Sequence, residues 1–205
     1  MKKIEEKLEK NNIRPTQISL DFHTFFWYGN FKEGEPVDTV VDILLSDEND
    51  EKKKIGEFIF TVIRGYTFEQ KENNILWSAD EISQELYEVV QDFIDENGRV
   101  PDEFMNSNLA YIYKMYINKE YRNKGIGTYS FAMLYDMLQE RTSLITVIPE
   151  PYDYEEDKEI EDDKEYNSEK NKIINLLEKF DFKKNLMNFT VYYKNTDYKL
   201  SLLND

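Results

Sequence analysis

The stretch from Ala110 to Gln139 constrains the fold more than any other part of the 205-residue chain. Ala110 to Ile117 is rich in β-branched and aromatic residues and carries only one charge, Lys114, which is the composition of a strand buried on at least one face. From Gly125 onward, apolar residues recur at intervals of three and four, which predicts an amphipathic helix. The polar residues between strand and helix therefore form a loop that leads into a helix N-terminus.

Two glycines, Gly125 and Gly127, fall in the first turn of this predicted helix. A glycine costs about 1 kcal/mol relative to alanine in a helix, so their position indicates a need for bare backbone. The free N–H groups of a first helical turn, together with the helix dipole, bind phosphate when no β-carbon blocks the approach. Arg122 and Lys124 add positive charge to this loop. The pattern predicts an anion site; the alternative is a turn that binds nothing.

The residues from Arg122 to Gly127 read RNKGIG and follow a predicted strand that ends at Ile117. They resemble the acetyl-CoA signature R/Q-x-x-G-x-G/A of the GNAT superfamily of N-acetyltransferases. Leu176 to Phe182 resembles the family's carboxy-terminal F-Y-E-K-L-G-F element, with Asp181 in place of the glycine. The resemblance covers about residues 110–194. It implies an α/β fold (an α+β mixed sheet) in which a central mixed β-sheet is flanked by helices.

The resemblance also implies which residues bind acetyl-CoA as cosubstrate. Met115 and Ile117 match the two strand positions whose backbone groups pair with the pantetheine arm. The residues expected to supply amides to the pyrophosphate are Arg122, Asn123, Lys124, Gly125, Ile126, Gly127 and Thr128, with Asn171 on a later helix as a further candidate. No metal is implied.

The usual catalytic side chains of the family are not matched. Where many members carry a glutamate base and a tyrosine acid, this chain has Tyr111 and Leu177. A thiol leaving group with a pKa near 8.5 departs readily without an acid, but an amine with a pKa of about 10.4 needs a base. We expect Glu57 or Glu150 to be that base, although either can be an ordinary exposed carboxylate. Tyr111 is a further catalytic candidate, because it occupies the position of the family's glutamate base.

The remaining segments predict further elements within a single domain that spans residues 1–205. The expected elements are a surface helix at 1–11, a strand or aromatic plug at 17–31, an antiparallel strand pair at 39–45 and 54–64, a helix at 79–96, a strand at 144–148 parallel to the one at 110–117, a helix at 173–180 and a final strand at 186–194. A helix directly before the strand at 110–117 departs from the resembled family and leaves the order of the earlier strands open.

Charge and composition exclude several classes of function. The net charge is −16 and no basic stripe is visible, which excludes sequence-independent nucleic-acid binding. The absence of cysteine excludes disulfides and cysteine zinc sites. No apolar run is long enough for a signal peptide or a membrane span, so we expect a cytoplasmic protein without a membrane partner. Half of the excess negative charge lies between Glu150 and Lys170, in a predicted acidic insertion at about 149–168.

Three functions are consistent with these features. The first is an acetyl-CoA-dependent N-acetyltransferase acting on a primary amine of a cationic small molecule or of a protein lysine or N-terminus, as a monomer or homodimer. The second is an acyl-CoA-binding protein with impaired catalysis. The third is an acidic interaction protein that uses Glu150 to Glu169 to bind a basic partner. In the first case the acidic segment either attracts the cationic acceptor or is simply a solvated loop.

Overall fold

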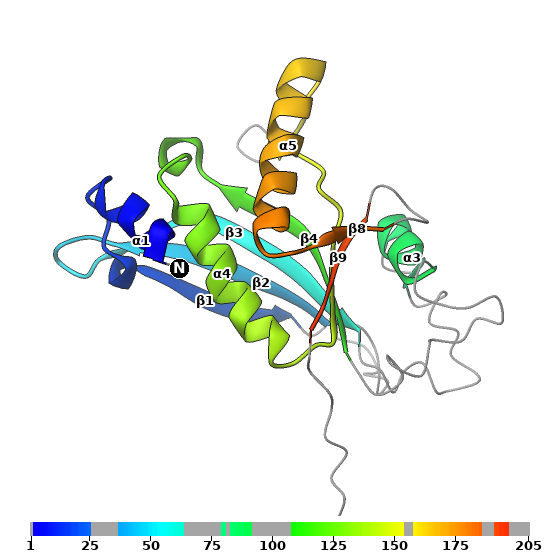
Figure 1. Ribbon diagram of the computed structural model, residues 1–205. Helices are drawn as coiled ribbons and strands as arrows, with labels where there is room; N and C mark the ends of the chain where they lie inside the picture. Colours follow the sequence, from blue (N-terminus) through cyan, green and yellow to red (C-terminus); the bar gives the residue numbers. More distant parts are fainter. Residues whose placement is uncertain are drawn as a thin grey trace, which may run out of the picture.

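A seven-stranded mixed sheet, in the strand order β1-β2-β3-β4-β5-β9-β8, forms the centre of the described part of the molecule. The computed structural model describes residues 2–25, 37–63, 79–80, 83–91, 108–153, 158–185 and 191–196. Helices flank this sheet, so the fold belongs to the α/β class, as predicted (Figure 1). Within the described ranges, no helix is both long and apolar enough to cross a membrane.

The order of the elements follows most of the predicted segments. The elements are α1 (Lys2–Glu9), η1 (Pro15–Gln17), β1 (Ile18–Phe25), β2 (Val37–Ser46), β3 (Lys52–Ile63), α3 (Gln84–Gln91), β4 (Leu109–Ile117), η3 (Lys119–Tyr121), α4 (Ile126–Gln139), β5 (Leu144–Val147), β6 (Tyr152–Asp153), β7 (Lys158–Glu159), α5 (Asp163–Lys179), β8 (Lys183–Lys184) and β9 (Tyr192–Asn195). The predicted elements at 17–31 and 79–96 lie partly outside the described residues.

Strands β1 to β4 form a run of antiparallel neighbours. The predicted antiparallel pair is therefore confirmed as β2 and β3. β3 and β4 are adjacent even though α3 lies between them in the sequence, which answers the open question of strand order. β5 runs parallel to β4, so β4, α4 and β5 form the predicted βαβ crossover.

The pairing between β4 and β5 is short. It extends only from Leu109 opposite Leu144 to Ile112 opposite Val147, whereas β4 continues against β3 as far as Ile117. A register shift against β3 makes Tyr113 the extra residue of a β-bulge at the point where this pairing ends. A bulge bends its strand and increases the local twist. All four residues of β5 pair with β4, so this ladder stops at the bulge because β5 itself ends, and β4 extends beyond it to Ile117.

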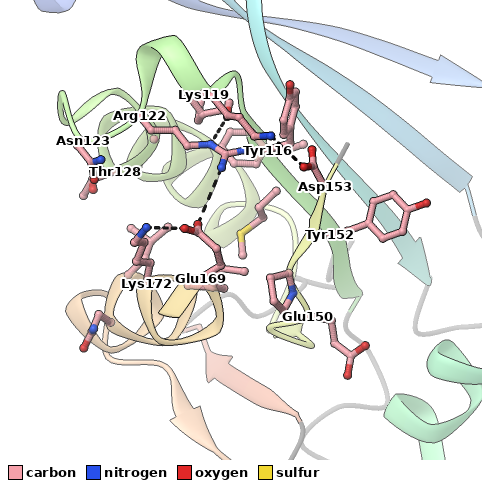
Figure 2. Close-up of a pocket in the computed structure, with 18 of the residues that line it drawn as sticks. Tyr116, Lys119, Arg122, Asn123, Thr128, Glu150, Tyr152, Asp153, Glu169 and Lys172 are labelled. Carbon is pink, nitrogen blue, oxygen red and sulfur yellow. Dashed lines mark hydrogen bonds and ion pairs between the residues drawn. The ribbon is translucent and has the colours of Figure 1, made fainter. Parts of the chain in front are cut away.

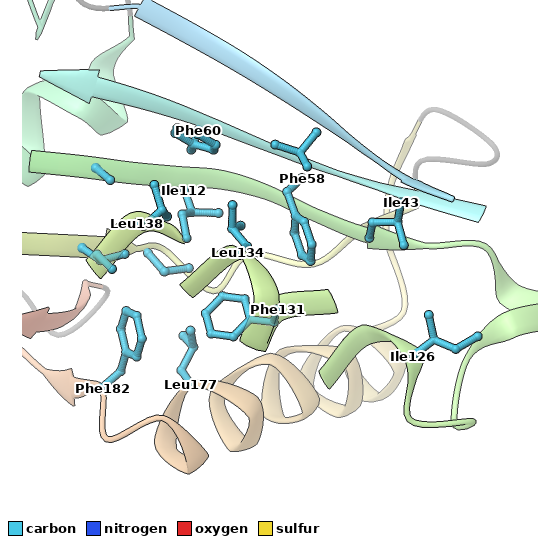
Figure 3. Close-up of a cluster of buried hydrophobic side chains, with 14 of the residues drawn as sticks. Ile43, Phe58, Phe60, Ile112, Ile126, Phe131, Leu134, Leu138, Leu177 and Phe182 are labelled. Atoms are coloured by element: carbon cyan, nitrogen blue, oxygen red, sulfur yellow. The ribbon is translucent and has the colours of Figure 1, made fainter. Parts of the chain in front are cut away.

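The main core lies between the sheet and the helices α1, α4 and α5 on one face (Figure 1). Phe131 of α4 is fully buried, and its ring packs edge-on against Phe58 of β3 and Phe180, with centroids 6.3 and 5.0 Å away (Figure 3). Burial of such side chains contributes roughly 1.5–3 kcal/mol each. A smaller apolar cluster under α3 includes Ile63 and Leu109. The main core thus holds α4 and α5 against β3 and β4.

The structure corrects two predicted boundaries. The segment at 149–168 is not a continuous acidic loop, because α5 begins at Asp163 and the short strands β6 and β7 pair before it. The carboxylate of Asp162 accepts a hydrogen bond of 2.8 Å from the backbone N–H of Glu165 and caps the helix. The final strand is β9, which starts at Tyr192, because Val191 belongs to no strand; residues 186–190 of the predicted strand lie outside the described ranges.

Candidate functional site

A pocket of about 410 Å³ lies beside the part of β4 that extends beyond its pairing with β5 (Figure 2). Its walls come from the end of β4, the loop and first turn of α4, the chain after β5, and α5. The lining residues used below are Lys7, Met115, Tyr116, Ile117, Lys119, Arg122, Asn123, Gly125, Gly127, Thr128, Glu150, Tyr152, Asp153, Glu165, Glu169, Lys172, Asn175 and Lys179. The pocket thus brings together segments that are distant in sequence around the predicted anion-binding loop.

The backbone at the start of α4 presents unused hydrogen-bond donors. The first helical bond at this end runs from the N–H of Tyr129 to the carbonyl of Gly125, at 3.0 Å. Within the described part of the chain, the N–H groups of residues 123–128 donate to no other protein group. Asn123 and Gly125 both adopt positive φ, at 63° and 94°. Such a run of free N–H groups at a helix N-terminus is a site suited to a phosphate.

Both glycines of the loop also have reasons within the fold. Gly125 has a φ of 94°, a conformation that residues with a β-carbon rarely adopt. A β-carbon on Gly127 would lie 3.4 Å from Cγ1 of Ile117, so the bare backbone lets α4 approach β4 closely. The glycines alone are therefore no proof of a ligand.

Basic side chains gather at the pocket although the protein as a whole has a net charge of −16. They are Lys7 of α1, Lys119, Arg122, and Lys172 and Lys179 of α5. The lining also has four acidic groups, Glu150, Asp153, Glu165 and Glu169, and Asp153 pairs with Lys119 at 2.9 Å. In a strongly acidic protein, such a local group of cations favours an anionic ligand with several charges.

Arg122 is held in place at the end of β4. Its Nε donates a hydrogen bond of 2.7 Å to the carbonyl of Ile117, and its guanidinium carbon lies 5.8 Å from the ring centroid of Tyr116. One terminal nitrogen lies 4.0 Å from a carboxylate oxygen of Glu169 (Figure 2). Arg122 is therefore anchored by backbone and ring contacts while its outer edge faces α5.

The structure brings together most of the predicted cofactor-binding residues. Those that line the pocket are Met115, Ile117, Arg122, Asn123, Gly125, Gly127 and Thr128. Three do not belong to the lining. The side chain of Lys124 lies 5.4 Å from the ring centroid of Tyr121, Ile126 is buried in the core, and Asn171 is exposed on α5. The backbone N–H groups of residues 124 and 126 still belong to the free run.

Sequence reasoning missed the contribution of α5. Lys172, Asn175 and Lys179 line the pocket at intervals of three and four residues, so they form one polar stripe along the helix. This spacing was visible in the sequence. Lys7, by contrast, reaches the pocket only through the packing of α1 on α4, which no local pattern indicates.

The two candidate bases lie in different places. Glu150 lines the pocket and is exposed just after β5. Glu57 does not line it: Phe58 faces the main core, so its neighbour Glu57 points to the other face of the sheet. There Glu57 contacts Lys114 at 2.7 Å and Lys54 at 2.6 Å. Burial alone would raise the pKa of Glu57, but these two hydrogen-bonded ammonium groups outweigh it and lower that pKa.

The residues at the family's acid and base positions are both buried. Tyr111 is 3% exposed in the cluster under α3, with its ring centroid 5.8 Å from that of Tyr113. Leu177 is fully buried in the main core. Neither lines the pocket.

No family model and no curated protein matches this chain. In the described residues, no group of three or more histidine, cysteine or acidic side chains is arranged to hold a metal ion.

Proposed function

We propose that this protein has the fold of the GNAT superfamily and is an N-acetyltransferase that transfers the acetyl group of acetyl-CoA to a primary amine. One observation carries the proposal. The loop of residues 123–128 with its free N–H groups and the part of β4 that extends beyond its pairing with β5 line the same pocket. A ligand with a diphosphate at one end and an extended amide-bearing arm fits both features.

The residues of the pocket fit acetyl-CoA. In the proposed complex, the N–H groups of residues 123–128 and Arg122 bind the pyrophosphate, and Lys172 and Lys179 neutralise further phosphate charge. The part of β4 from Met115 to Ile117, which extends beyond its pairing with β5, offers an edge to the amides of the pantetheine arm. This arrangement directs the thioester toward the point where the pairing of β4 with β5 ends.

The proposed reaction needs few side chains. The cosubstrate supplies an activated acetyl group as a thioester. Glu150 accepts a proton from the acceptor ammonium, directly or through one water, and the neutral amine forms a bond to the acyl carbon. Backbone N–H groups of β4 beyond its pairing with β5 stabilise the oxyanion until the carbon–sulfur bond breaks. The thiolate then leaves without a dedicated acid, and the acceptor nitrogen loses its remaining extra proton to water as the amide forms. Leu177, at the usual tyrosine position, has no proton to give, which agrees with this route.

Charge favours a cationic acceptor. Glu150 and Asp153 line the pocket on the side of the chain that follows β5, and Glu165 lines it from α5. The net charge of −16 adds a long-range field that attracts cations. We therefore propose a polyamine, an aminoglycoside-like molecule or a protein lysine or N-terminus as the substrate class.

The second candidate is an acyl-CoA-binding protein that does not transfer the group. Two positions favour it: Tyr111 is buried away from the pocket, and Leu177 has no acidic or basic group, so neither supplies a catalytic side chain. An acidic interaction protein has less support, since part of the acidic segment is folded into the pocket wall as β6 and α5.

Release of the CoA thiol in the presence of an amine panel tests the proposal. Because the chain has no cysteine, a thiol reagent detects only the product. We expect turnover with polycationic amines. Binding of CoA without turnover on any amine would support the second candidate, and absence of both binding and turnover would contradict the two CoA-dependent functions.

A further inference from the structure

The pocket contains one acidic side chain that contacts two of its cations. Glu169 of α5 lies with one carboxylate oxygen 2.5 Å from Nζ of Lys172 and the other 4.0 Å from a terminal nitrogen of Arg122 (Figure 2). Its side chain is 24% exposed, so water screens these contacts only in part. The carboxylate thus lies between two cations that belong to the proposed phosphate site.

We propose that Glu169 is an internal counter-ion that competes with the phosphates of the cofactor for Arg122 and Lys172, and so weakens cofactor binding. This inference rests on the proposed function. A phosphate at the N–H groups of residues 123–128 would lie beside Arg122, which belongs to the same loop. It would share that cation with a carboxylate of like charge. Like charges in a partly buried site repel each other, so binding must displace Glu169 or bear the repulsion.

The opposite role, in which Glu169 holds Arg122 ready for the phosphate, has weaker support. Arg122 is already fixed by the hydrogen bond from its Nε to the carbonyl of Ile117 and by the ring of Tyr116. The contact with Glu169 is the longest of its interactions with a polar group at 4.0 Å. Removal of the carboxylate should therefore leave Arg122 in position and free its outer edge for a ligand.

The consequence for an enzyme is easier release of the product. CoA carries the same phosphates after the acetyl group has left, and product release limits many enzymes. Because Glu169 competes with the phosphates, it weakens the binding of CoA and of acetyl-CoA to the same extent. We therefore expect Glu169 to raise the rate at which CoA leaves, and its loss to increase product inhibition.

The test compares wild type with Glu169→Gln by calorimetry, with CoA and with pantetheine, which lacks phosphates, as ligands. We expect the variant to bind CoA about tenfold more tightly, within the usual range for coupled sites. Affinity for pantetheine should not change. Glu178→Gln, which removes an equal charge from α5 outside the pocket, controls for net charge and should alter CoA affinity less than about twofold.

The outcomes separate this inference from the proposed function. If wild type binds CoA and Glu169→Gln binds it equally or more weakly, Glu169 is not a competitor and the inference is wrong. An equal gain in Glu178→Gln would also overturn it, because the effect would then be one of net charge. If neither wild type nor Glu169→Gln binds CoA, the proposed function itself fails.

Discussion

At the residue scale, Thr128 allows the phosphate site to be tested without damage to the fold. It is the third residue of α4 and lines the pocket. A glutamate at this helix position is favourable for the helix, because it complements the dipole and the free N–H groups. The same carboxylate would repel a phosphate and occupy its place. Thr128→Glu should therefore weaken CoA binding at least about 100-fold while the melting temperature stays equal or rises.

Titration calorimetry and thermal unfolding check this prediction, with Thr128→Ser as the control that keeps binding. A folded Thr128→Glu variant with wild-type affinity would show that phosphate does not bind at α4. Gly125 is less suitable for this purpose, because its φ of 94° means that any substitution there strains the loop itself.

Glu150 is the candidate base that the structure places at the pocket. Glu150→Gln keeps the size of the side chain but cannot accept a proton. We expect kcat to fall by roughly 10² to 10³, with the KM for acetyl-CoA almost unchanged. Steady-state kinetics with the best amine of the panel measures this, and Glu161→Gln, outside the pocket lining, is the matched control. An unchanged kcat would remove Glu150 from the mechanism.

Glu57 should act on stability and its dependence on pH. Its pKa is lowered in the folded protein from 4.5, so it stabilises the fold at pH values above 4.5 and loses this effect as the pH falls through the lower, folded value. Glu57→Gln should cost about 1 kcal/mol near neutral pH, discounted for solvent exposure. Urea unfolding in neutral and acidic buffer should show that this difference disappears in acid. A difference that persists there would mean that packing, not charge, explains it.

At the element scale, the start of α5 depends on one cap. The carboxylate of Asp162 accepts a hydrogen bond from the N–H of Glu165, in a helix whose first turns are exposed and carry little apolar burial. Asp162→Ala should destabilise the protein by about 1 kcal/mol, whereas Asp162→Asn should retain most of the stability because asparagine also caps well. Denaturant unfolding of both variants gives the answer. Equal loss in the two would point to the charge rather than to the cap.

The elements differ in how well the sequence predicts them. α4 could be predicted because its apolar residues recur at helical spacing, and β5 because all four of its residues are buried and form an almost continuous apolar run. The first turns of α5 could not, since exposed residues such as Asp163 and Lys164 carry no period and read as an acidic loop. The bulge at Tyr113 could not be predicted either, because one extra residue in an apolar strand does not change the composition of that strand.

The direction in which strand side chains point could not be predicted from the sequence either. Glu57 was a reasonable candidate by residue type, but the face to which a strand residue points depends on the register of its neighbours. Register shifts occur on both sides of β3, between Ile43 and Leu44 of β2 and between Ile59 and Phe60 of β3 itself. The loop residues around Gly125 were predictable because the glycines and the following helix specify their position locally.

At the scale of the whole molecule, the charge of the pocket contrasts with that of the protein. The chain has a net charge of −16, yet its pocket gathers Lys7, Lys119, Arg122, Lys172 and Lys179 from separate elements. In the proposed complex, these cations bind the anionic cofactor. The negative potential of the rest of the surface attracts the cationic acceptor. The two ligands would meet where the pairing of β4 with β5 ends.

Titration of CoA into the wild-type protein, paired with thermal unfolding, tests whether the pocket binds CoA. We predict one CoA per chain and, at about 100 times the Kd, a stabilisation of about 2.7 kcal/mol. For a chain of this length that corresponds to a rise in melting temperature of roughly 5 to 10 °C. No heat of binding and an unchanged melting temperature in a large excess of CoA would contradict this prediction.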